Sequence, residues 1–422
     1  MERLLRFIKH LIPKSLFRQA APYYHLLLAL LGALMYRFPG KHMIVIGVTG
    51  TKGKSSTVEY LNAIFEAAGF STAIISTIRI KIGATSKPNK MRMTMPGRMF
   101  IQRTLRRALD ASCTVAIIEM TSEGARQKRD RLLFMNALIF TNLSPEHIES
   151  HGSLDAYAAA KLSIARRLMH SPKRPRYIVA NTDDAYGAKF LSTVTEHQLG
   201  FSLKETPHTT SITGGTFIFK GMEFSINFPG DFSIKNALAA TTLTSAMGIP
   251  LETIRTALSG LTTIPGRAED VAPGNEFPII VDYAHTPDSL QALYDAYESK
   301  RRICVLGATG GGRDHWKRPL MGEIAENACE KVILTNEDPY DEDPREIVTQ
   351  LQKNMKRTPE IIMDRREAIA HAISIAREGD VVLITGKGTD PSICGPRGTQ
   401  EVWSDAEVAR EELAHMRESR VV

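Results

Sequence analysis

The sequence predicts an α/β protein with two sheet-containing domains after a short helical segment. Apolar, β-branched runs alternate with helical stretches in both halves of the chain, which is typical of parallel sheets covered by helices. A glycine-rich turn joins the first such run to a helix, as in a phosphate-binding loop. The length of 422 residues fits two or three domains. We expect a helical segment at residues 1–42, a central P-loop domain with a parallel sheet at 43–265, and a Rossmann-like α/β domain at 266–422.

The composition excludes several classes of protein. Hydrophobic residues make up 43% and charged residues 23%, an ordinary globular mixture. The 30 glycines and 21 prolines exclude collagen-like and low-complexity chains. The four cysteines, at positions 113, 304, 329 and 394, have no short paired spacing. They exclude a disulfide-rich scaffold and a zinc site made of cysteines alone, and they favour a reducing, cytoplasmic location.

The positive charge of the protein is concentrated in its first 42 residues. The net charge of the chain is +7, and this segment carries seven lysines and arginines against one glutamate. A nucleic-acid-binding domain would spread such charge over a folded face, so we expect no nucleic acid as a partner. Residues 3–12 show the pattern of a basic amphipathic helix, and a second apolar run follows at 23–38.

Several interpretations of this segment compete. A signal peptide is disfavoured because no small-residue cleavage site is present. A membrane span would be short, and His25 interrupts the apolar run. Peripheral contact of residues 1–38 with the inner face of the membrane is slightly favoured. Packing on the protein's own body, or dimerisation, stays open as the alternative.

Residues 42–68 combine a strand, a glycine-rich turn and a helix. The run at 42–48 predicts the strand, and residues 58–68 predict the helix. Backbone N–H groups of such a turn bind phosphates, Lys54 adds a positive charge, and the Ser55 hydroxyl can ligate Mg²⁺. The strict motif would place a glycine where this chain has Val48. The residues expected to bind the nucleotide are Gly50, Thr51, Lys52, Gly53, Lys54, Ser55 and Ser56.

Further motifs follow the phosphate loop. A buried-strand pattern at 115–118 ends in Glu119, a Thr-Asn-Leu sequence at 141–143 leads to His147, and Lys161 lies one helical turn after Tyr157. The later motifs are Asn236 near a predicted helix start, Pro-Gly-Arg at 265–267, Asp-Tyr-Ala-His at 282–285, Gly-Gly-Gly-Arg-Asp at 310–314, Glu-Asp-Pro-Tyr at 337–340 and Gly-Lys-Gly-Thr-Asp at 386–390.

These motifs, in this order, resemble the Mur ligases, which are ATP-dependent enzymes that join an amino acid to a carboxylate. The resemblance spans about residues 43–405, and the motif at 310–314 points to the tripeptide-synthetase branch. It implies ATP and Mg²⁺ as cofactors and a role in peptidoglycan synthesis. The implied reaction passes through an acyl phosphate, which the amine of an amino acid then attacks.

The resemblance also implies roles for residues of the central domain. Glu119 and His147 correspond to Mg²⁺ ligands, and Lys161 corresponds to a carbamylated lysine. Together with Lys54 these are the implied catalytic residues, and together with Ser55 they are the implied ligands of two Mg²⁺ ions. The implied substrate-binding residues of this domain are Thr121, Ser122 and Arg129. The chain departs from the family pattern at Glu123, where a histidine is usual.

Roles in the rest of the chain follow from the same resemblance. Asn236 is implied to pair with adenine, Asp282 to contact the ribose, and Arg267 to bind ATP at the interdomain link. For Asn236, an ordinary polar residue at a helix N-terminus is the alternative. The implied substrate-binding residues of this part are His285, Arg313, Asp338, Pro339, Tyr340, Gly386, Lys387 and Asp390.

The acceptor is less well defined by the sequence. The branch usually begins with a uridine-nucleotide-binding domain, which the 42 residues before the first predicted strand do not supply. Either another surface holds a UDP-linked acceptor, or the acceptor differs. A ligase that acts on folate, polyglutamate or a capsular polymer, and a non-catalytic, membrane-associated nucleotide-binding protein, are the alternatives. We expect a monomer that binds small-molecule substrates.

The loop at 337–343 bears on which amino acid is added. Family members that add diaminopimelate usually carry an arginine where this chain has Tyr340, and the loop itself holds five acids and no cation. This charge favours a lysine- or ornithine-like side chain over one with a distal carboxylate. The alternative is that the acids form a solvated rim and that Arg313, Arg365 or Lys387 binds the carboxylate.

Overall fold

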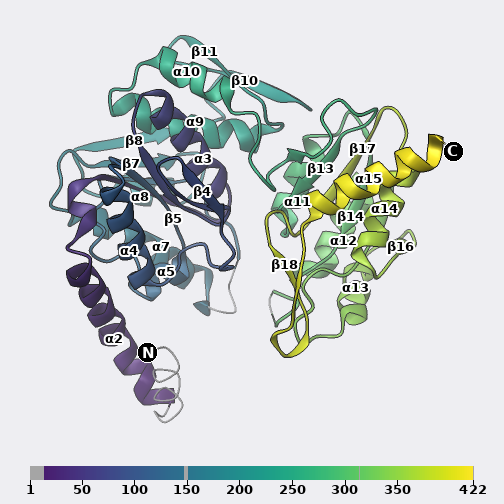
Figure 1. Cartoon of the computed structure of the whole chain (residues 1–422), viewed down its shortest axis with the longest axis horizontal. Helices are drawn as coiled ribbons and strands as arrows, with labels where there is room; N and C mark the ends of the chain where they lie inside the picture. The colour runs from purple at the N-terminus through teal and green to yellow at the C-terminus, as the bar shows by residue number, and fades with distance from the viewer. Residues whose placement is uncertain (1–13, 147–150, 313, 422) are drawn as a thin grey trace. The chain divides into compact units, whose positions relative to one another are not determined.

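The computed structural model describes residues 14–146, 151–312 and 314–421, which form two compact units (Figure 1). Unit 1 consists of Met1–Ser144, Ser153–Phe201 and Ala239–Ile249, and unit 2 consists of Pro145–Gly152, Ser202–Leu238 and Pro250–Val422. The chain therefore passes between the units several times. The domain boundary at residues 265 and 266 stays a prediction.

Unit 1 is built on an eight-stranded sheet with the order β4-β3-β2-β5-β1-β6-β7-β8. All neighbouring strands are parallel except β3 and β4, which add an antiparallel edge. β1 lies in the middle, and its residues from Val45 on are buried, as expected of a parallel strand covered on both faces. The strands are β1 Ile44–Thr49, β2 Thr72–Ile75, β3 Arg79–Ile82, β4 Thr85–Pro88, β5 Val115–Met120, β6 Ala137–Phe140, β7 Tyr177–Asn181 and β8 His197–Phe201.

Helices pack on this sheet through apolar side chains. Phe140 of β6 stacks on Phe190 of α8 at a ring-centroid distance of 3.9 Å, and both rings are fully buried. The Ser153 side chain accepts a hydrogen bond from the Ala156 amide and so caps the start of α7. The helices are α2 Lys14–Met35, η1 Pro39–His42, α3 Lys54–Ala67, α4 Arg98–Asp110, α5 Ser122–Arg126, α7 Leu154–Met169 and α8 Gly187–Leu191. Helix α9, Asp231–Ala246, has residues in both units.

Unit 2 contains the second α/β sheet, with the order β12-β13-β17-β14-β15-β16. Only β12 is antiparallel to its neighbour, so the predicted Rossmann-like pattern of parallel strands is confirmed. These strands are β12 Glu269–Asp270, β13 Ile279–Asp282, β14 Arg301–Leu306, β15 Lys331–Leu334, β16 Glu360–Ile361 and β17 Asp380–Thr385. The helices are α10 Leu251–Gly260, α11 Pro287–Asp295, α12 Lys317–Ala328, α13 Pro344–Gln352, α14 Arg365–Ile375, α15 Asp405–Val421 and the short η2 Pro396–Gly398.

Unit 2 also has two small antiparallel sheets that the sequence analysis did not predict. One is three-stranded, with the order β11-β10-β9, and the other pairs β18 with β19. In the first, Phe217 and Phe224 lie opposite each other and stack with their ring centroids 5.2 Å apart. The strands are β9 His208–Ser211, β10 Gly214–Phe219, β11 Met222–Ile226, β18 Ser392–Cys394 and β19 Gln400–Val402.

Helix α2 packs against α4 on one side and leaves an apolar face exposed. Ala29 and Ala33 are buried, and a Cβ on Gly32 would lie 2.9 Å from the Met99 sulfur, so the two helices approach closely. Packing on the protein's own body, which the sequence left open as the alternative to membrane contact, is therefore observed for this face of α2. The exposed apolar residues of α2 are Tyr23, Leu26, Leu27, Leu30, Leu31, Leu34 and Met35.

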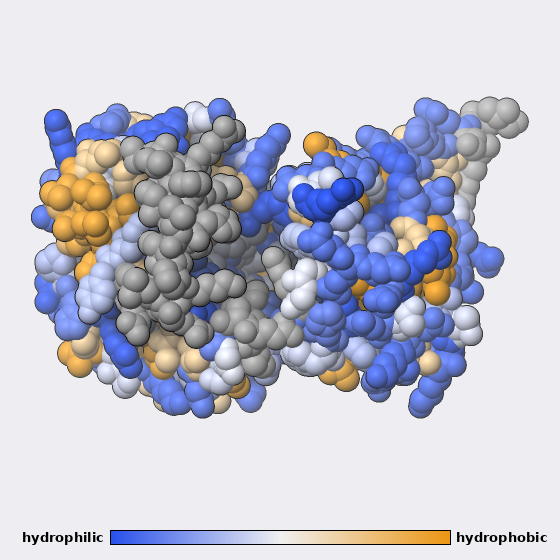
Figure 2. Space-filling view, turned by 90° about the horizontal axis from the view of Figure 1, so that it is seen from below, coloured by the Kyte–Doolittle hydropathy of each residue, from blue (hydrophilic) through white to orange (hydrophobic). Residues whose placement is uncertain are grey.

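Two predictions about the N-terminal segment have different outcomes. The amphipathic pattern at 3–12 lies outside the described residues. Of the apolar run at 23–38, residues 23–35 belong to helix α2, which begins at Lys14, continues through Pro22 and ends at Met35. Among the residues that the structure describes, no helix has both the length and the apolar character that crossing a bilayer requires. Figure 2, in which the molecule is seen from below, shows that apolar side chains gather in patches on this face.

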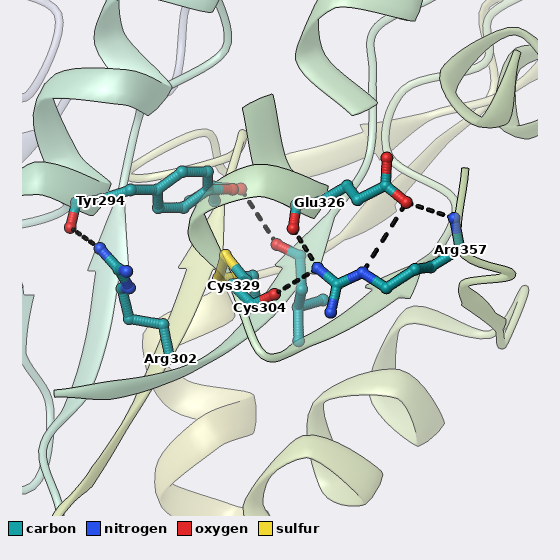
Figure 3. Close-up of a disulfide and its surroundings, with 8 residues drawn as sticks. Tyr294, Arg302, Cys304, Glu326, Cys329 and Arg357 are labelled. Carbon is teal, nitrogen blue, oxygen red and sulfur yellow. Dashed lines mark hydrogen bonds and ion pairs between the residues drawn. A yellow bond between two sulfur atoms is a disulfide. The ribbon is translucent and has the colours of Figure 1, made fainter. Parts of the chain in front are cut away.

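Unit 2 contains one disulfide, between Cys304 of β14 and Cys329 at the end of α12 (Figure 3). The two Cα atoms are 6.2 Å apart, and both residues are buried. The Arg357 side chain donates a hydrogen bond to the Cys329 carbonyl and so fixes the same corner. One disulfide is not a disulfide-rich scaffold, so that exclusion stands. The two cysteines are 25 residues apart in the sequence and meet through the packing of α12 on β14, so their spacing did not indicate this pair.

Candidate nucleotide and substrate sites

The phosphate loop of unit 1 lies between the end of β1 and the start of α3. Gly50 has a φ of 151°, and a Cβ at this position would lie 1.9 Å from the Thr141 hydroxyl. Only glycine fits there. Gly53, with a φ of 80°, is the N-cap of α3 and provides no side-chain hydrogen bond to its amides, and a helix N-terminus of this kind favours a phosphate. Val48 is a buried strand residue, which places the departure from the strict motif before the turn.

Lys54 and Lys161 both contact the backbone of this loop. The Lys54 Nζ atom donates a hydrogen bond of 2.8 Å to the Thr51 carbonyl. The Lys161 Nζ atom, from the buried face of α7, donates one of 2.6 Å to the Gly50 carbonyl and lies over the Tyr157 ring. The Tyr157 hydroxyl is 3.2 Å from the Thr51 hydroxyl. Helix α7 therefore brings the predicted carbamylated lysine to the phosphate loop.

Two of the predicted metal ligands lie together on neighbouring elements. In the sheet β5 pairs with β1 in parallel, and Val48 lies opposite Glu119. The Ser55 hydroxyl donates a hydrogen bond of 3.0 Å to the buried Glu119 carboxylate, and the Thr77 amide donates one of 2.9 Å to the same oxygen. A carboxylate next to a hydroxyl at a phosphate loop fits the oxygen ligands that Mg²⁺ prefers.

His147 lies outside the described residues, and among those that are described no group of three metal-binding side chains is found. The predicted metal set is thus represented by Ser55, Glu119 and Lys161 alone. Thr77 was missed by the sequence analysis, because its contribution is a backbone amide that carries no residue-type signal.

The predicted substrate residues of unit 1 lie around α5. Thr121 caps this helix by accepting a hydrogen bond of 3.0 Å from the Gly124 amide, and Ser122 is buried at its first position. Arg129 donates hydrogen bonds to the Met95 carbonyl and the Gln127 side chain. Burial lowers the pKa of the Arg129 guanidinium. Thr121 therefore has a structural function in any case, whereas Arg129 presents a cation in a half-buried position.

The residues of unit 2 that are predicted to bind the nucleotide lie near strands β12 and β13 and on helix α9. Both oxygens of the Asp282 carboxylate accept amide hydrogen bonds of 2.7 Å, from Ala268 and from Ala284. The Arg267 guanidinium lies over the Tyr283 ring, at 4.5 Å from its centroid. Asn236 is a buried residue of α9. These contacts fix the positions of Asp282 and Arg267, while the predicted roles of all three residues toward ATP stay predictions.

His285 follows the same strand. Its Nδ1 atom lies 2.6 Å from the Tyr283 carbonyl, and its Nε2 atom lies 3.1 Å from the Glu146 carboxylate. Glu146 is the residue before the predicted metal ligand His147. His285 is thus connected to the 141–152 motif, and the spacing of neither motif showed this.

The predicted amino-acid loop of unit 2 contains a buried ion pair. The Lys387 Nζ atom lies 2.8 Å from the Asp338 carboxylate, and both side chains are almost completely buried. The same lysine donates a hydrogen bond to the Ser392 carbonyl, and the Cys394 amide donates one to Asp338. These two predicted substrate residues therefore bind each other. Gly386 lies beside them, with a φ of 108°.

The other acids of the loop also have partners within the chain, contrary to the expectation of free charges. Asp341 accepts a hydrogen bond from the Arg397 amide, Glu342 pairs with Arg318 at 2.9 Å, and Asp343 caps α13. Glu337 is fully buried, which raises the pKa of its carboxyl, and one of its oxygens accepts a hydrogen bond from Thr309. Because these acids are bound within the chain, they repel a distal carboxylate of the incoming amino acid less than the sequence indicated.

The cations proposed as alternative carboxylate ligands are engaged as well. Arg365 makes two hydrogen bonds, of 2.8 and 2.7 Å, to the Asp405 carboxylate, and both residues are buried. Lys387 is held by Asp338, as described above. Arg313 lies outside the described residues. Of the remaining predicted residues, Pro339 is buried, Tyr340 is half-buried at a φ of 53°, and Asp390 lies 3.9 Å from Lys387.

Two family models match this chain. The Mur ligase middle domain matches residues 48–244, and the Mur ligase, glutamate ligase domain matches residues 266–388. The protein belongs to the Mur ligase family. Mur ligases are ATP-dependent enzymes that use Mg²⁺ and join an amino acid to their substrate, so the predicted enzyme class is confirmed. No N-terminal domain of the family is among the matching models.

Similar proteins include tripeptide synthetases of several bacteria. The 2,6-diaminopimelate ligase of Syntrophomonas wolfei is 35% identical over 378 residues, with 86% of this chain and 76% of the relative covered. The UDP-N-acetylmuramyl-tripeptide synthetase of Roseiflexus is 34% identical over 419 residues, with 92% and 82% covered. Together with the family models, these relatives confirm the predicted resemblance to the tripeptide-synthetase branch.

Solved structures agree on the fold. A UDP-N-acetylmuramoyl-L-alanyl-D-glutamate 2,6-diaminopimelate ligase superposes with a TM-score of 0.61 at 27% identity, with 89% of this chain and 79% of that chain covered. The folylpolyglutamate synthase of Mycobacterium tuberculosis superposes with a TM-score of 0.69, and 94% and 98% of the two chains are covered. Its 16% identity shows a shared fold alone. The predicted α/β architecture is therefore confirmed.

Proposed function

We propose that this Mur ligase adds an amino acid to the free carboxylate of a UDP-N-acetylmuramoyl dipeptide, in the synthesis of peptidoglycan precursors. The observation that carries the proposal is the phosphate loop with Lys54, Lys161, Ser55 and Glu119 gathered around it. The tripeptide synthetases among its relatives support this acceptor over folate or a polymer.

In the first step the acceptor carboxylate attacks the γ-phosphorus of ATP, and the bond to the β-phosphate oxygen breaks. Lys54 and the N-terminal amides of α3 stabilise the charge on the transferred phosphoryl group. In the second step the amine of the amino acid attacks the acyl carbon and loses a proton, and phosphate leaves with the former carboxylate oxygen. Ser55, Glu119 and His147 would hold Mg²⁺, which neutralises phosphate charge when it is bound.

Phosphate release tests this function most directly. The full-length protein is incubated with ATP and Mg²⁺, and with each of three acceptors: a UDP-muramoyl dipeptide, a folate and a polyglutamate chain. We expect release that depends on the muramoyl acceptor together with an amino acid. Release with folate or polyglutamate alone would favour the alternative acceptors, and release with none would favour a nucleotide-binding protein without ligase activity.

We propose that Lys161 is carbamylated in the active enzyme. Addition of CO₂ to the neutral amine forms a carbamate and releases a proton, and the product is an anion beside the phosphate loop. Its buried position at the Gly50 carbonyl supports this, because a nearby Mg²⁺ would favour the anionic form. In ¹³C-bicarbonate the protein is expected to show a carbamate NMR signal that Lys161→Ala lacks. Short carboxylates are expected to restore part of the activity of this variant.

We also propose a cytoplasmic monomer that contacts the inner membrane surface through residues 1–38. The exposed leucines of α2 and the net charge of +6 in residues 1–42 support this contact. Removing the segment would uncover the face of α4 that α2 covers, so point changes are the better test. Leu27→Glu with Leu31→Glu should abolish sedimentation with anionic liposomes and keep ligase activity. Equal sedimentation of the wild type and the double variant would exclude this contact, and analytical ultracentrifugation tests the monomer.

We propose a lysine- or ornithine-like amino acid as the second substrate. The support is Tyr340, which stands where diaminopimelate-adding members carry arginine, and the engagement of Arg365 and Lys387 by their own acids. Several relatives are diaminopimelate ligases, which argues for the other choice. Direct competition between lysine and meso-diaminopimelate in one ligation assay decides between them.

A further inference from the structure

Helix α2 touches the predicted acceptor side of unit 1 through a polar contact as well as through its apolar packing. The His25 Nδ1 atom lies 3.0 Å from the Arg98 guanidinium, and Arg98 is the first residue of α4. The same guanidinium nitrogen donates a hydrogen bond of 2.6 Å to the Gln127 carbonyl, just after α5. The N-terminal segment thus reaches the region in which the resemblance implies acceptor-binding residues.

Two arginines meet there, and neither has an ion-pair partner among the residues that the structure describes. The contacts of Arg98 are His25 and the Gln127 carbonyl, and those of Arg129 are the Met95 carbonyl, the Gln127 side chain and the Met93 sulfur. Both guanidiniums are half-buried, and the Nε atom of each is buried without a hydrogen-bond partner.

The electrostatics of the two arginines also favour an anion. Burial lowers the pKa of both guanidiniums, and the charge of Arg129 lowers that of Arg98 further. Glu123 is the acid that acts on Arg129, but its carboxylate is exposed and accepts hydrogen bonds from Gln127 and Arg126 instead. Two neighbouring cations at this depth favour the binding of an anion between them.

The start of α4 adds further positive potential at the same place. This helix has 13 residues, its N-cap Gly97 provides no side-chain cap, and its first turn holds no acid. The N-terminus of such a helix favours an anion. The preceding loop is tied to the reaction side, because the Thr94 hydroxyl lies 2.8 Å from that of Thr77, whose amide binds Glu119.

We infer that Arg98, with the N-terminus of α4, adds a second cation beside Arg129 for an anionic group of the acceptor, and that His25 of α2 positions Arg98 there. The inference rests on the proposed function, and it adds residues of α2 and α4 to the acceptor-binding region that the resemblance implies around Arg129. The ligand group is a phosphate or a carboxylate of the acceptor. Helix α2 then forms a wall of the substrate site, in addition to any contact with lipid.

Steady-state kinetics of the full-length enzyme test this role. Arg98→Gln should raise the KM for the muramoyl acceptor by about 10-fold or more, as the loss of a charge-assisted hydrogen bond implies, and leave the KM for ATP unchanged. Arg98→Lys keeps the charge and should restore part of the affinity, which a purely structural role would not predict. His25→Ala should raise the same KM by a smaller factor. The matched control is Arg107→Gln, an exposed position of the same helix. An acceptor KM that Arg98→Gln leaves unchanged would overturn the inference.

Binding measurements identify the group and separate this inference from the proposed function. The phosphate loop is filled with a non-hydrolysable ATP analogue, and UDP or L-alanyl-D-glutamate is titrated in a calorimeter. Weaker binding of UDP to Arg98→Gln identifies a phosphate, and weaker binding of the dipeptide identifies a carboxylate. Equal binding of both probes to wild type and variant contradicts a role of Arg98 in binding the acceptor. If no muramoyl acceptor is ligated but a probe binds through Arg98, the proposed function fails and the site remains.

Discussion

The phosphate loop at 50–56 and the acidic loop at 337–343 treat their charged groups in opposite ways. In the phosphate loop Lys54 and Lys161 donate to backbone carbonyls, and the amides at the start of α3 have no side-chain cap. In the acidic loop the carboxylates of Asp338, Glu342 and Asp343 already bind donors of the protein itself. The first arrangement is prepared for a ligand's charge, whereas the second stabilises the fold. Charges in a motif therefore indicate a ligand only after their partners within the chain are known.

Lys54→Ala gives the largest expected effect on activity and the smallest on the fold. Loss of the charge that stabilises the transferred phosphoryl group should lower kcat about 10²–10³-fold, as for other preorganised transition-state donors. The melting temperature should stay close to that of the wild type, because Lys54 is half-buried at the start of α3 and is not part of the apolar core. The exposed Lys87→Ala serves as the control. Full phosphate release by Lys54→Ala would show that the loop does not act on ATP.

Lys387→Met tests whether the ion pair of the acidic loop stabilises the fold. It removes the Lys387 cation from its buried pair with the Asp338 carboxylate, and breaking such a pair costs about 3–5 kcal/mol. Urea unfolding should therefore show a large loss of stability, in contrast to Lys54→Ala. The double variant Lys387→Met with Asp338→Leu should recover much of the lost stability, because neither charge of the buried pair remains. If the single variant is as stable as the wild type, the pair is not what holds this loop.

Tyr340→Arg sharpens the contrast by adding a free cation to a loop whose acids are engaged. The new guanidinium could bind a distal carboxylate with two hydrogen bonds. We expect the ratio of kcat/KM for diaminopimelate over lysine to rise about 10-fold, the value of one charge-assisted contact. Tyr340→Phe, which adds no charge, should leave the ratio unchanged. A wild type that already prefers diaminopimelate, with little change in Tyr340→Arg, would contradict the proposed amino acid.

Asp130→Asn concerns a buried carboxylate of unit 1 that is less well satisfied than Asp338. Its oxygens have no hydrogen-bond partner, although Arg167 lies 3.3 Å away, and burial raises the pKa of Asp130 from 3.8 to about 6. Between these two values the folded state binds more protons, so the contribution of Asp130 to stability decreases as the pH rises. The stability of Asp130→Asn relative to the wild type should therefore increase from pH 4.5 to pH 7 in urea unfolding. A constant difference at both pH values would assign the pH dependence to other groups.

Backbone-defined features could be predicted from the sequence, and features formed by pairing could not. Strand β1, the turn after it and the strands that carry Glu119 and Asp282 follow from local apolar runs and glycines. The Lys387–Asp338 pair, the Cys304–Cys329 disulfide and the contact of His25 with Arg98 join positions 25 or more residues apart. No local pattern records such a contact, since it depends on how the elements pack.

The antiparallel edge of the unit 1 sheet has a consequence for solubility. An edge strand presents unpaired amides and carbonyls with which the sheet of another molecule can align. Strand β4 forms this edge, all four of its residues are exposed, and it ends in Lys87 and Pro88. The lysine charge repels a second copy of the strand, and the proline has no N–H to offer. Lys87 and Pro88 thus protect the β4 edge of the sheet from pairing with another molecule at the concentrations of a crowded cell.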